Sequence, residues 1–395
     1  MSQGTDSKAA NLDPARVRVL LEEMVAIDST NPSLVPGGAG EERIARYVAG
    51  VLERAGFEAV VEAPAPGRPN AVGVLRGTGG GRSLMLVGHL DTVSTEGMDI
   101  APLAPRVEDG RLYGRGACDM KGGLAAILAA VEAVAASGWR PAGDLIVAGV
   151  SDEEYASIGV EHLVRRWRAD AGVIAEPTGL DLVIAHKGFA WVRVDVEGVA
   201  AHGSSLDGGV DAITQAAKVI TAYDDYQRRE LTRVVPELVT RPSLHASLIR
   251  GGRELSTYPD HCRVEFERRT VPGETEDAVR REIQSILDRL AKDDSTFRAS
   301  ADVFFYRQAY QVARDEPVVT AIVAACRKVV GHVPGFGASS GWMDSAVMGA
   351  AGIPTVIFGP AGSGAHSAVE WVDLESVVTT ARVLTELVRE SCAAP

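Results

Sequence analysis

Apolar residues along the first 190 positions follow two alternating patterns. Where they recur every three or four residues they predict amphipathic helices, near residues 14–25, 44–52, 122–136 and 160–166. Short, nearly continuous apolar runs predict strands, over residues 70–75, 83–87, 144–150 and 172–175. This alternation of strand and helix predicts an α/β fold with a mainly parallel sheet flanked by helices.

A different pattern begins after residue 188. Between residues 191 and 196 apolar and polar side chains alternate, which predicts a strand with one wet face. The pattern then predicts, in order, a helix, two strands and a helix, over residues 211–230, 244–249, 263–269 and 275–290. This order predicts a small, mostly antiparallel α+β domain over residues 189–297.

The α/β pattern returns after about residue 297. A helix is predicted over 317–330, a strand over 354–358 and a helix over 374–390. We therefore expect residues 1–188 and 298–395 to form one catalytic domain in two parts, with the α+β domain inserted between them. The length of 395 residues fits two domains.

The amino-acid composition limits the kinds of partner that the protein can bind. Hydrophobic residues make up 46% of the chain and charged residues 24%, as in a soluble globular protein. The formal net charge of −13 argues against nucleic acid and against an anionic membrane surface, because both bind basic proteins. A small anion can still bind where cations gather in one cleft.

The cysteines and the apolar runs indicate the cellular compartment of the protein. Four cysteines lie far apart without a Cys-x-x-Cys pair, as expected of free thiols in a reducing cytoplasm. Residues 1–11 are polar, so we see no signal peptide, and the apolar run over 124–136 is too short to span a bilayer. We expect a cytoplasmic protein.

Polar side chains with metal-ligand chemistry follow several of the predicted strands. His89 and Asp91 come directly after the buried strand over 83–87. Ligand chemistry in open α/β sheets gathers at the carboxyl ends of strands. Asp91 could hold the second imidazole nitrogen of His89 and so fix its tautomer. A solvated loop pair is the alternative.

Three further acids occupy comparable places. Asp119 lies in a glycine-rich segment, where an unusual backbone path could let one carboxylate bridge two cations; a helix N-cap is the alternative. Glu153 and Glu154 follow the strand over 144–150, and adjacent acids repel unless a cation or a shared proton compensates. A solvated start of a helix would explain them equally well.

Glu176 and His366 complete the set. Glu176 precedes Pro177 at the end of the strand over 172–175, and the proline disfavours helical backbone there. His366 follows the last predicted strand in a glycine-rich loop. Each residue alone could belong to an ordinary turn or surface loop. Their joint occurrence after successive strands of one sheet predicts a centre with two divalent metals.

These motifs resemble those of the dinuclear zinc amidohydrolase and metallopeptidase family that includes acetylornithine deacetylase, succinyl-diaminopimelate desuccinylase, aminoacylase and glutamate carboxypeptidase. The matching segments run from about Glu22 to the end of the chain. They are a His-x-Asp, a glycine-flanked Asp, a Glu-Glu pair, a Glu-Pro and a C-terminal histidine, here His89-Leu90-Asp91, Asp119, Glu153-Glu154, Glu176-Pro177 and His366.

The resemblance implies a role for each residue. One metal would be held by His89, Asp119 and Glu176, and the other by Asp119, Glu154 and His366. Glu153 would be the general base for a hydroxide that bridges the metals, and the peptide bond after Asp119 would be cis. Zinc is the expected metal, although cobalt or manganese fits the same ligands.

The inserted domain carries two further matches. His202 matches a lid histidine that donates to the oxyanion, often from the partner subunit, and Arg269 matches an arginine that anchors a substrate carboxylate. Two positions depart from the family pattern: Glu267 stands where it has aspartate, and Ser256 where it has asparagine. The substitution at Ser256 puts substrate contacts at that position in doubt. The family pattern also implies a homodimer formed through this domain.

The sequence therefore predicts a metal-dependent hydrolase that cleaves the amide bond of an N-acyl amino acid or short peptide bearing a carboxylate. A carboxypeptidase or dipeptidase of the same family is an alternative. A non-catalytic binding protein on the same scaffold is a second alternative, which would predict missing ligands. The acyl group and the amino-acid preference remain open at this point.

Overall fold

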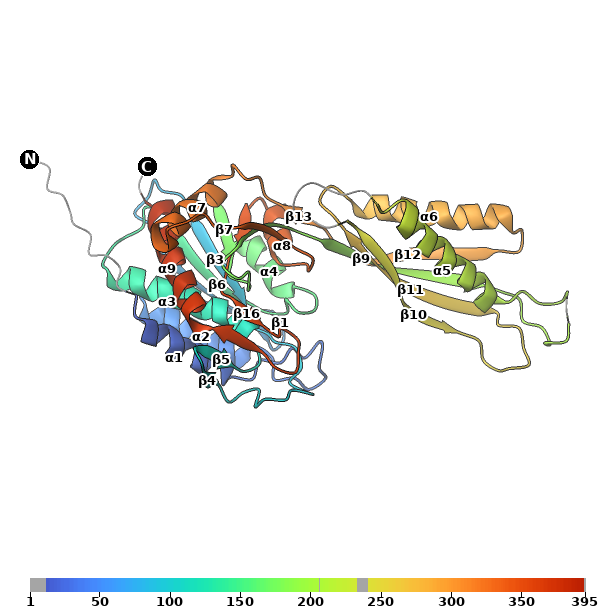
Figure 1. Cartoon of the computed structure of the whole chain (residues 1–395), viewed down its shortest axis with the longest axis horizontal. Helices are drawn as coiled ribbons and strands as arrows, with labels where there is room; N and C mark the ends of the chain where they lie inside the picture. Colours follow the sequence, from blue (N-terminus) through green and yellow to red (C-terminus); the bar gives the residue numbers. More distant parts are fainter. Residues whose placement is uncertain (1–11, 206, 233–240, 394–395) are drawn as a thin grey trace, which may run out of the picture. The chain divides into compact units, whose positions relative to one another are not determined.

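The computed structural model describes residues 12–205, 207–232 and 241–393 (Figure 1). These residues form two compact units. The first contains the described residues up to Ile184, together with Val312–Gly337 and the chain from Met343 onward. The second contains the described residues of Ala185–Gln311 and the short segment Ala338–Trp342. The polar segment over 1–11 lies outside the described residues.

A nine-stranded sheet, most of which belongs to the first unit, has the order β1-β2-β6-β3-β7-β15-β8-β13, with β14 paired to β8. Its central strands β6, β3, β7 and β15 run parallel, and antiparallel strands flank them. The strands span Glu58–Ala65 (β1), Arg68–Leu75 (β2), Leu84–His89 (β3), Leu145–Val150 (β6), Ala171–Ile174 (β7), Leu182–His186 (β8), Tyr310–Gln311 (β13), Phe336–Ser339 (β14) and Thr355–Ile357 (β15). Because parallel strands end at one edge, the residues after β3, β6 and β7 come together there.

Two groups of helices flank this sheet (Figure 1). One group contains α1 (Pro14–Val25), α2 (Glu42–Arg54), α3 (Gly122–Ala136), α7 (Pro317–Val330) and α9 (Leu374–Ser391), and the other α4 (Ile158–Arg166) and α8 (Ser345–Ala350). The side chain of Asp13 caps α1, and Pro14 occupies its first turn. Apolar residues of α3 are buried on nearly every side, which explains its alanine-rich composition.

A smaller sheet also belongs to the first unit, in the order β16-β17-β5-β4. Its short strands are Arg106–Glu108 (β4), Arg111–Tyr113 (β5), Gly362–Ser363 (β16) and Trp371–Asp373 (β17). Their length gave no apolar pattern to detect, and sequence analysis missed them. The sheet ties the segment before Asp119 to the segment that carries His366, because β5 pairs with β17.

The second unit is a four-stranded antiparallel sheet in the order β10-β11-β9-β12, with two helices. Its elements are β9 (Gly188–Glu197), α5 (Ala212–Arg229), β10 (Ser243–Gly251), β11 (His261–Thr270), α6 (Glu276–Asp293) and β12 (Arg298–Arg307). Side chains along β9 and β11 alternate between buried and half-buried, so one face packs on α5 and α6. The α+β fold is as the sequence predicted.

The boundary of this unit is corrected by β12. Sequence analysis ended the inserted domain at residue 297 and returned the chain to the α/β pattern there. Instead β12 pairs with β9 along its whole length, so the second unit continues to Gln311. The error has a physical cause: β12 carries a bulge between Val303 and Phe305, which breaks the alternation that would reveal a strand.

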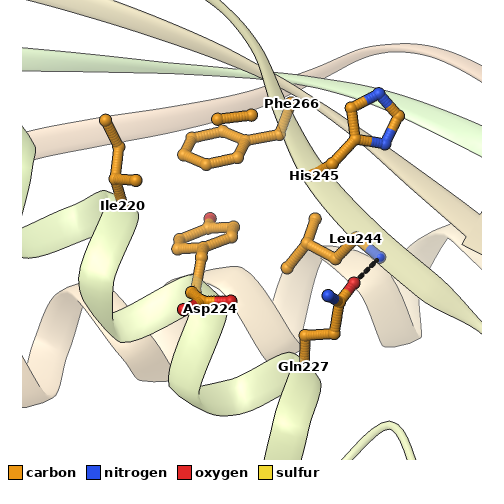
Figure 2. Close-up of a pocket in the computed structure, with 8 residues that line it drawn as sticks. Ile220, Asp224, Gln227, Leu244, His245 and Phe266 are labelled. Carbon is orange, nitrogen blue, oxygen red and sulfur yellow. Dashed lines mark hydrogen bonds between the residues drawn. The ribbon is translucent and has the colours of Figure 1, made fainter.

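A cavity of about 230 Å³ lies between α5 and strands β10 and β11 (Figure 2). The stacked rings of Tyr223 and Phe266, 4.3 Å apart, form part of its lining. The side-chain oxygen of Gln227 accepts a hydrogen bond from the backbone N–H of Leu244 at 2.5 Å. The cavity therefore borders the core of the second unit.

Two observations concern thiols and membranes. All four cysteines are buried and free, which confirms the prediction of unpaired thiols. Among the described residues, no helix is both long enough and apolar enough to cross a membrane.

His186, at the end of β8, makes acid stability a testable property. It is fully buried, and burial lowers its pKa to about 4 even though Nδ1 lies 2.9 Å from the carbonyl oxygen of Lys187. In the unfolded chain the same imidazole titrates near 6.5. Between these values the unfolded state binds more protons. The contribution of His186 to stability is therefore complete above about pH 6.5 and is lost as the pH falls toward 4.

We expect the free energy of unfolding to fall by about 2 kcal/mol because of His186 when the pH is lowered from 7 to 5. Urea denaturation of wild type and His186→Gln in the presence of chelator measures it, since chelator removes the pH dependence of metal binding. The variant should lose less stability on acidification than wild type. An equal loss would contradict the assignment, and the exposed His332→Gln serves as control.

Candidate metal centre

His89 is the last residue of the buried strand β3, and its side chain is almost wholly enclosed. Its Nδ1 lies 2.9 Å from the backbone carbonyl oxygen of Asp91. Its Nε2 lies 3.0 Å from Oδ1 of Asp119 and 3.6 Å from Oε1 of Glu176. The carbonyl contact fixes which nitrogen points away from the carboxylates, and so the imidazole presents Nε2 to both of them.

The role predicted for the Asp91 side chain is corrected. Its Oδ1 lies 3.8 Å from Nδ1 of His89, beyond hydrogen-bond distance. Both carboxylate oxygens accept hydrogen bonds from other groups. Oδ1 accepts from the backbone N–H of Glu153. Oδ2 accepts from the backbone N–H of Glu154 and from the side-chain amide of Asn31. The Asp91 carboxylate therefore orients the Glu-Glu segment, while its backbone carbonyl orients the imidazole.

Asp119 lies in the tight turn η1 (Ala117–Lys121), directly before α3. The peptide bond between Asp119 and Met120 is cis, as the resemblance implied. Close packing dictates glycine behind this turn: a Cβ on Gly123 would lie 1.8 Å from the carbonyl oxygen of Ala175, the residue before Glu176. The glycines thus bring the Asp119 turn against the segment that follows β7.

A buried glutamate that sequence analysis missed holds this turn. One oxygen of Glu370 accepts from the backbone N–H groups of Cys118 and Asp119, at 2.9 and 3.0 Å. The other accepts from Gly116 N–H at 3.0 Å and from the Arg115 guanidinium at 2.7 Å. Nothing in the sequence marks Glu370, because its partners are mostly backbone groups that lie some 250 positions earlier in the chain.

This arrangement predicts an effect on metal affinity. In the wild-type protein the Glu370 carboxylate accepts hydrogen bonds from these N–H groups. In Glu370→Gln one oxygen is replaced by an NH₂ group, which cannot accept them, so the Asp119 turn would shift. We expect metal affinity to fall roughly 10- to 100-fold, the usual effect of losing a group that orients a ligand. Competition with a chromogenic chelator measures it, with Glu375→Gln, exposed in the first turn of α9, as control. Unchanged affinity would exclude a positioning role for Glu370.

His366 lies after β16 in a left-handed backbone conformation, with φ of 59°. Its Nε2 lies 2.9 Å from Oε2 of Glu154 and 3.4 Å from Oδ2 of Asp119. Asp119 therefore faces His89 with one oxygen and His366 with the other. Burial opposes ionisation of Asp119, but hydrogen bonds from His366 and His89 outweigh it and lower its pKa. Its contacts with Asp119 and Glu154 raise the pKa of His366 to about 10.

Glu153, Glu154 and Glu176 lie close to Asp119 and the two histidines. Burial raises the pKa of Glu153, Glu154 and Glu176, and the charges of neighbouring carboxylates add to the effect. Asp344, buried directly before α8 and missed by sequence analysis, adds to the negative field at Glu153 and Glu176. A site with this surplus of buried carboxylates is stabilised by cations. Imidazole and carboxylate donors fit zinc and related divalent metals.

Ligand atoms group into two trios in which all three lie within 4.8 Å of one another. One contains His89, Asp119 and Glu154, and the other His89, Glu153 and Glu176. Neither is one of the trios that the resemblance implied: the first combines ligands of both implied metals, and the second contains Glu153. Its assignment as a base and not a ligand stays a prediction.

A buried ionic network, also missed, supports the Glu-Glu segment from behind. The guanidinium of Arg68 donates to Glu41, Asn31 and Asp152, at 2.7, 3.0 and 2.8 Å. Asn31 in turn donates to Asp152 and, at 2.7 Å, to the Asp91 carboxylate. Asp152 directly precedes Glu153. The network links β2 to the backbone of the site, and its members gave no sequence signal because no metal or catalytic motif includes them.

The three site residues predicted on the inserted domain belong to the second unit. His202 forms an isolated bridge with Thr257, and the N–H of Gly203 donates to the carbonyl oxygen of Ser256 at 2.8 Å, so His202 and Ser256 lie on neighbouring loops. Both are exposed. Arg269 lies on β11, where its Nε donates to Glu267 at 2.6 Å.

The α/β fold and the acid-rich centre fit a metal-dependent hydrolase, and the comparisons with known proteins agree. The family model of peptidase family M20/M25/M40 matches residues 85–390. The chain belongs to this family. The proteins similar to it include deacylating enzymes and peptidases. It is a hydrolase that acts on amide bonds.

Two curated relatives match nearly the whole chain. An acetylornithine deacetylase from Myxococcus xanthus is 30% identical, with 95% of this chain and 97% of the relative covered. An N-formyl-4-amino-5-aminomethyl-2-methylpyrimidine deformylase from Bacillus subtilis is 29% identical, with 94% and 95% covered.

Solved structures share the fold. Aminopeptidase PepT from Bacillus cereus has a TM-score of 0.79 at 22% identity, with 96% of this chain and 99% of that chain covered. A Bacillus subtilis protein described as a dinuclear metal binding peptidase of family M20 has a TM-score of 0.75 at 15% identity, with 96% and 98% covered. These likenesses confirm the predicted fold class.

Proposed function

We propose that the protein is a two-metal amidohydrolase that removes an acyl group from an N-acylated amino acid or a related small amine. The observation that carries the proposal is the double contact of Asp119, whose two oxygens face His89 and His366 at 3.0 and 3.4 Å. A carboxylate in this position can bridge two cations. The other carboxylates then balance their charge.

We propose the ligand sets that the resemblance implied, and the contacts of His89 and His366 with these carboxylates support them. His89, Asp119 and Glu176 would bind one cation, and Asp119, Glu154 and His366 the other. Zinc suits these donors, and cobalt or manganese would fit as well. When bound, two such cations polarise a carbonyl oxygen and lower the pKa of water toward about 7.

Glu153 would move the protons. Burial raises the pKa of its carboxyl group, which brings the group closer to neutral pH, where a carboxylate can both accept and return a proton. It would accept a proton from the attacking water and return it to the leaving nitrogen. Its backbone N–H donates to Asp91 at 3.2 Å, which restrains the main chain that carries it.

Groups of the second unit would bind the substrate. Nδ1 of His202 lies 2.8 Å from the Ser204 hydroxyl, and Nε2 would then be the donor for the oxyanion. Arg269 would anchor a substrate carboxylate through its guanidinium. Ser256 is too short to make the contact of the asparagine that the family has there, and we assign it at most a minor role.

The relatives support two related activities, removal of an acetyl group and removal of a formyl group. One relative is a deacetylase and another a deformylase. The alternative, an exopeptidase, is favoured by the aminopeptidase among the structural neighbours. A non-catalytic binding protein is disfavoured, because all five predicted ligands are present and lie together.

A screen of the zinc-loaded protein distinguishes these activities. The panel contains N-acetyl, N-formyl, N-succinyl and N-carbamoyl amino acids and free dipeptides. Hydrolysis of an N-acyl amino acid, with dipeptides inert, is the expected result. Cleavage of dipeptides alone would favour the exopeptidase, and no turnover of any member would contradict the proposed function.

We also propose a cytoplasmic homodimer formed through the second unit. Among the described residues, β10 is an edge strand, and it exposes Leu248 and Ile249 by 49% and 54%. An edge strand with exposed apolar side chains is a surface that a second copy can extend. Light scattering in solution tests it, with Ile249→Lys expected to give a monomer.

A further inference from the structure

One face of the second unit's sheet carries a group of aromatic side chains, which we call the aromatic face: Phe189, Trp191, Phe305 and Trp342. Strand register places the first three. Trp191 of β9 stands opposite Phe305 of β12, and Phe189 stands between Arg269 of β11 and Arg307 of β12. Residues directly opposite in neighbouring strands share a face of the sheet. The rings therefore lie beside the arginine that we assign to the substrate carboxylate.

The rings are in contact with one another. Trp191 stacks on Phe305 at 4.9 Å, and Phe189 lies 5.4 Å from Trp191. Trp342, on the short segment 338–342 that joins this unit, meets Phe189 edge-on at 6.3 Å. These are favourable geometries for aromatic pairs, so the group forms one continuous π-surface.

The aromatic face is not the core of the sheet. Residues that alternate with it, such as Ala190, Val192 and Phe266, are buried on the side of α5 and α6. The four rings are only half-buried. A cluster of large rings left partly open to solvent is costly for a soluble protein and marks a binding surface.

The polar groups around the rings restrict what can bind. Both indole N–H groups already have acceptors, Glu267 for Trp191 and the carbonyl oxygen of Gln308 for Trp342. What they offer a ligand is therefore ring surface. Two guanidinium groups lie over the rings, Arg269 at 5.1 Å from Phe189 and Arg307 at 4.9 Å from Phe305. A ligand that places a planar ring against the face and an anionic group at its edge satisfies both features.

We propose that the aromatic face binds the side chain of the substrate, and that the preferred substrates are N-acyl derivatives of aromatic amino acids. This inference rests on the proposed function, since it takes Arg269 to hold the carboxylate. In such a substrate the carboxylate and the ring are a few bonds apart. Arg269 and Phe189 are likewise neighbours across two strands. Trp342 and Phe189 are then the residues that determine specificity.

The test compares N-acetyl-phenylalanine with N-acetyl-cyclohexylalanine, which has a ring of similar size but no π-system. Wild type should bind and hydrolyse the aromatic compound roughly threefold to tenfold better, the range of stacking contributions beyond burial. Trp342→Leu and Phe189→Leu should each remove this preference, so that the ratio of the values for the two compounds falls to about one. Trp139→Leu, a half-buried tryptophan in the first unit, should retain it.

Binding is measured by calorimetry and turnover separately, so the two proposals fail separately. Equal affinity for the two compounds, or an equal loss for both in Trp342→Leu, would overturn the aromatic face as a binding site. Preference in binding without turnover of any amide would retain it and contradict the proposed reaction. If the face instead packs on a second copy, Trp342→Leu would change the mass in solution without changing the ratio of affinities, and the inference would be wrong.

Discussion

Glu153→Gln is expected to lower kcat by about 10²–10⁴-fold while the protein keeps both metals. The amide is nearly the same size as the carboxylate but cannot accept the proton from water. The geometry makes this a demanding test, because Glu153 lies in one of the two trios of possible ligand atoms, with His89 and Glu176. Steady-state kinetics and metal content must therefore be measured on the same preparation.

The neighbouring substitution Glu154→Gln is the matched comparison. Glu154 contacts His366 at 2.9 Å and is assigned as a ligand, so its loss should lower metal content as well as activity. If Glu153→Gln lost a metal and Glu154→Gln did not, the roles of the two glutamates would be exchanged. Near-normal turnover of Glu153→Gln would exclude it as the base.

Asp119→Ala has the second large expected effect, the loss of both metals from one substitution. We assign each of the other ligands to a single cation, whereas the oxygens of Asp119 face both histidines. Metal analysis after gel filtration should give close to none per chain, and activity should be abolished. Asp99→Ala, an exposed aspartate of the same unit, is the control. Full occupancy in Asp119→Ala would contradict the bridge, and loss of one metal would make Asp119 an ordinary ligand.

The sequence predicted most elements of the fold because their patterns are regular. The helix over 122–136 and the helix over 317–330 were predicted with the bounds that the structure has. Two strands with weak alternation were missed, since β1 is exposed at half its positions and β12 is bulged. The short apolar strand β8 was missed although its pattern is regular. Packing and pairing define such strands, and neither can be seen in a local pattern.

The candidate site shows the same division. Residues that carry chemistry, such as His89, Asp119 and His366, could be found because few residue types bind metals and they follow strands. Supporting residues could not: Glu370 binds backbone groups, and Arg68 joins a network brought together by three separate segments. The role of the Asp91 carboxylate was wrong because its distance from the imidazole depends on the turn after β3, which residue identity does not reveal.

Metal content is the most direct test of the central claim, that two cations share the Asp119 carboxylate. Elemental analysis of the purified protein, before and after chelation and after re-addition of zinc, is combined with a hydrolysis assay in each state. We predict about two divalent metals per chain, loss of hydrolysis when they are removed, and recovery when they return. A protein without bound transition metal, whose hydrolysis is indifferent to chelator, would contradict the account.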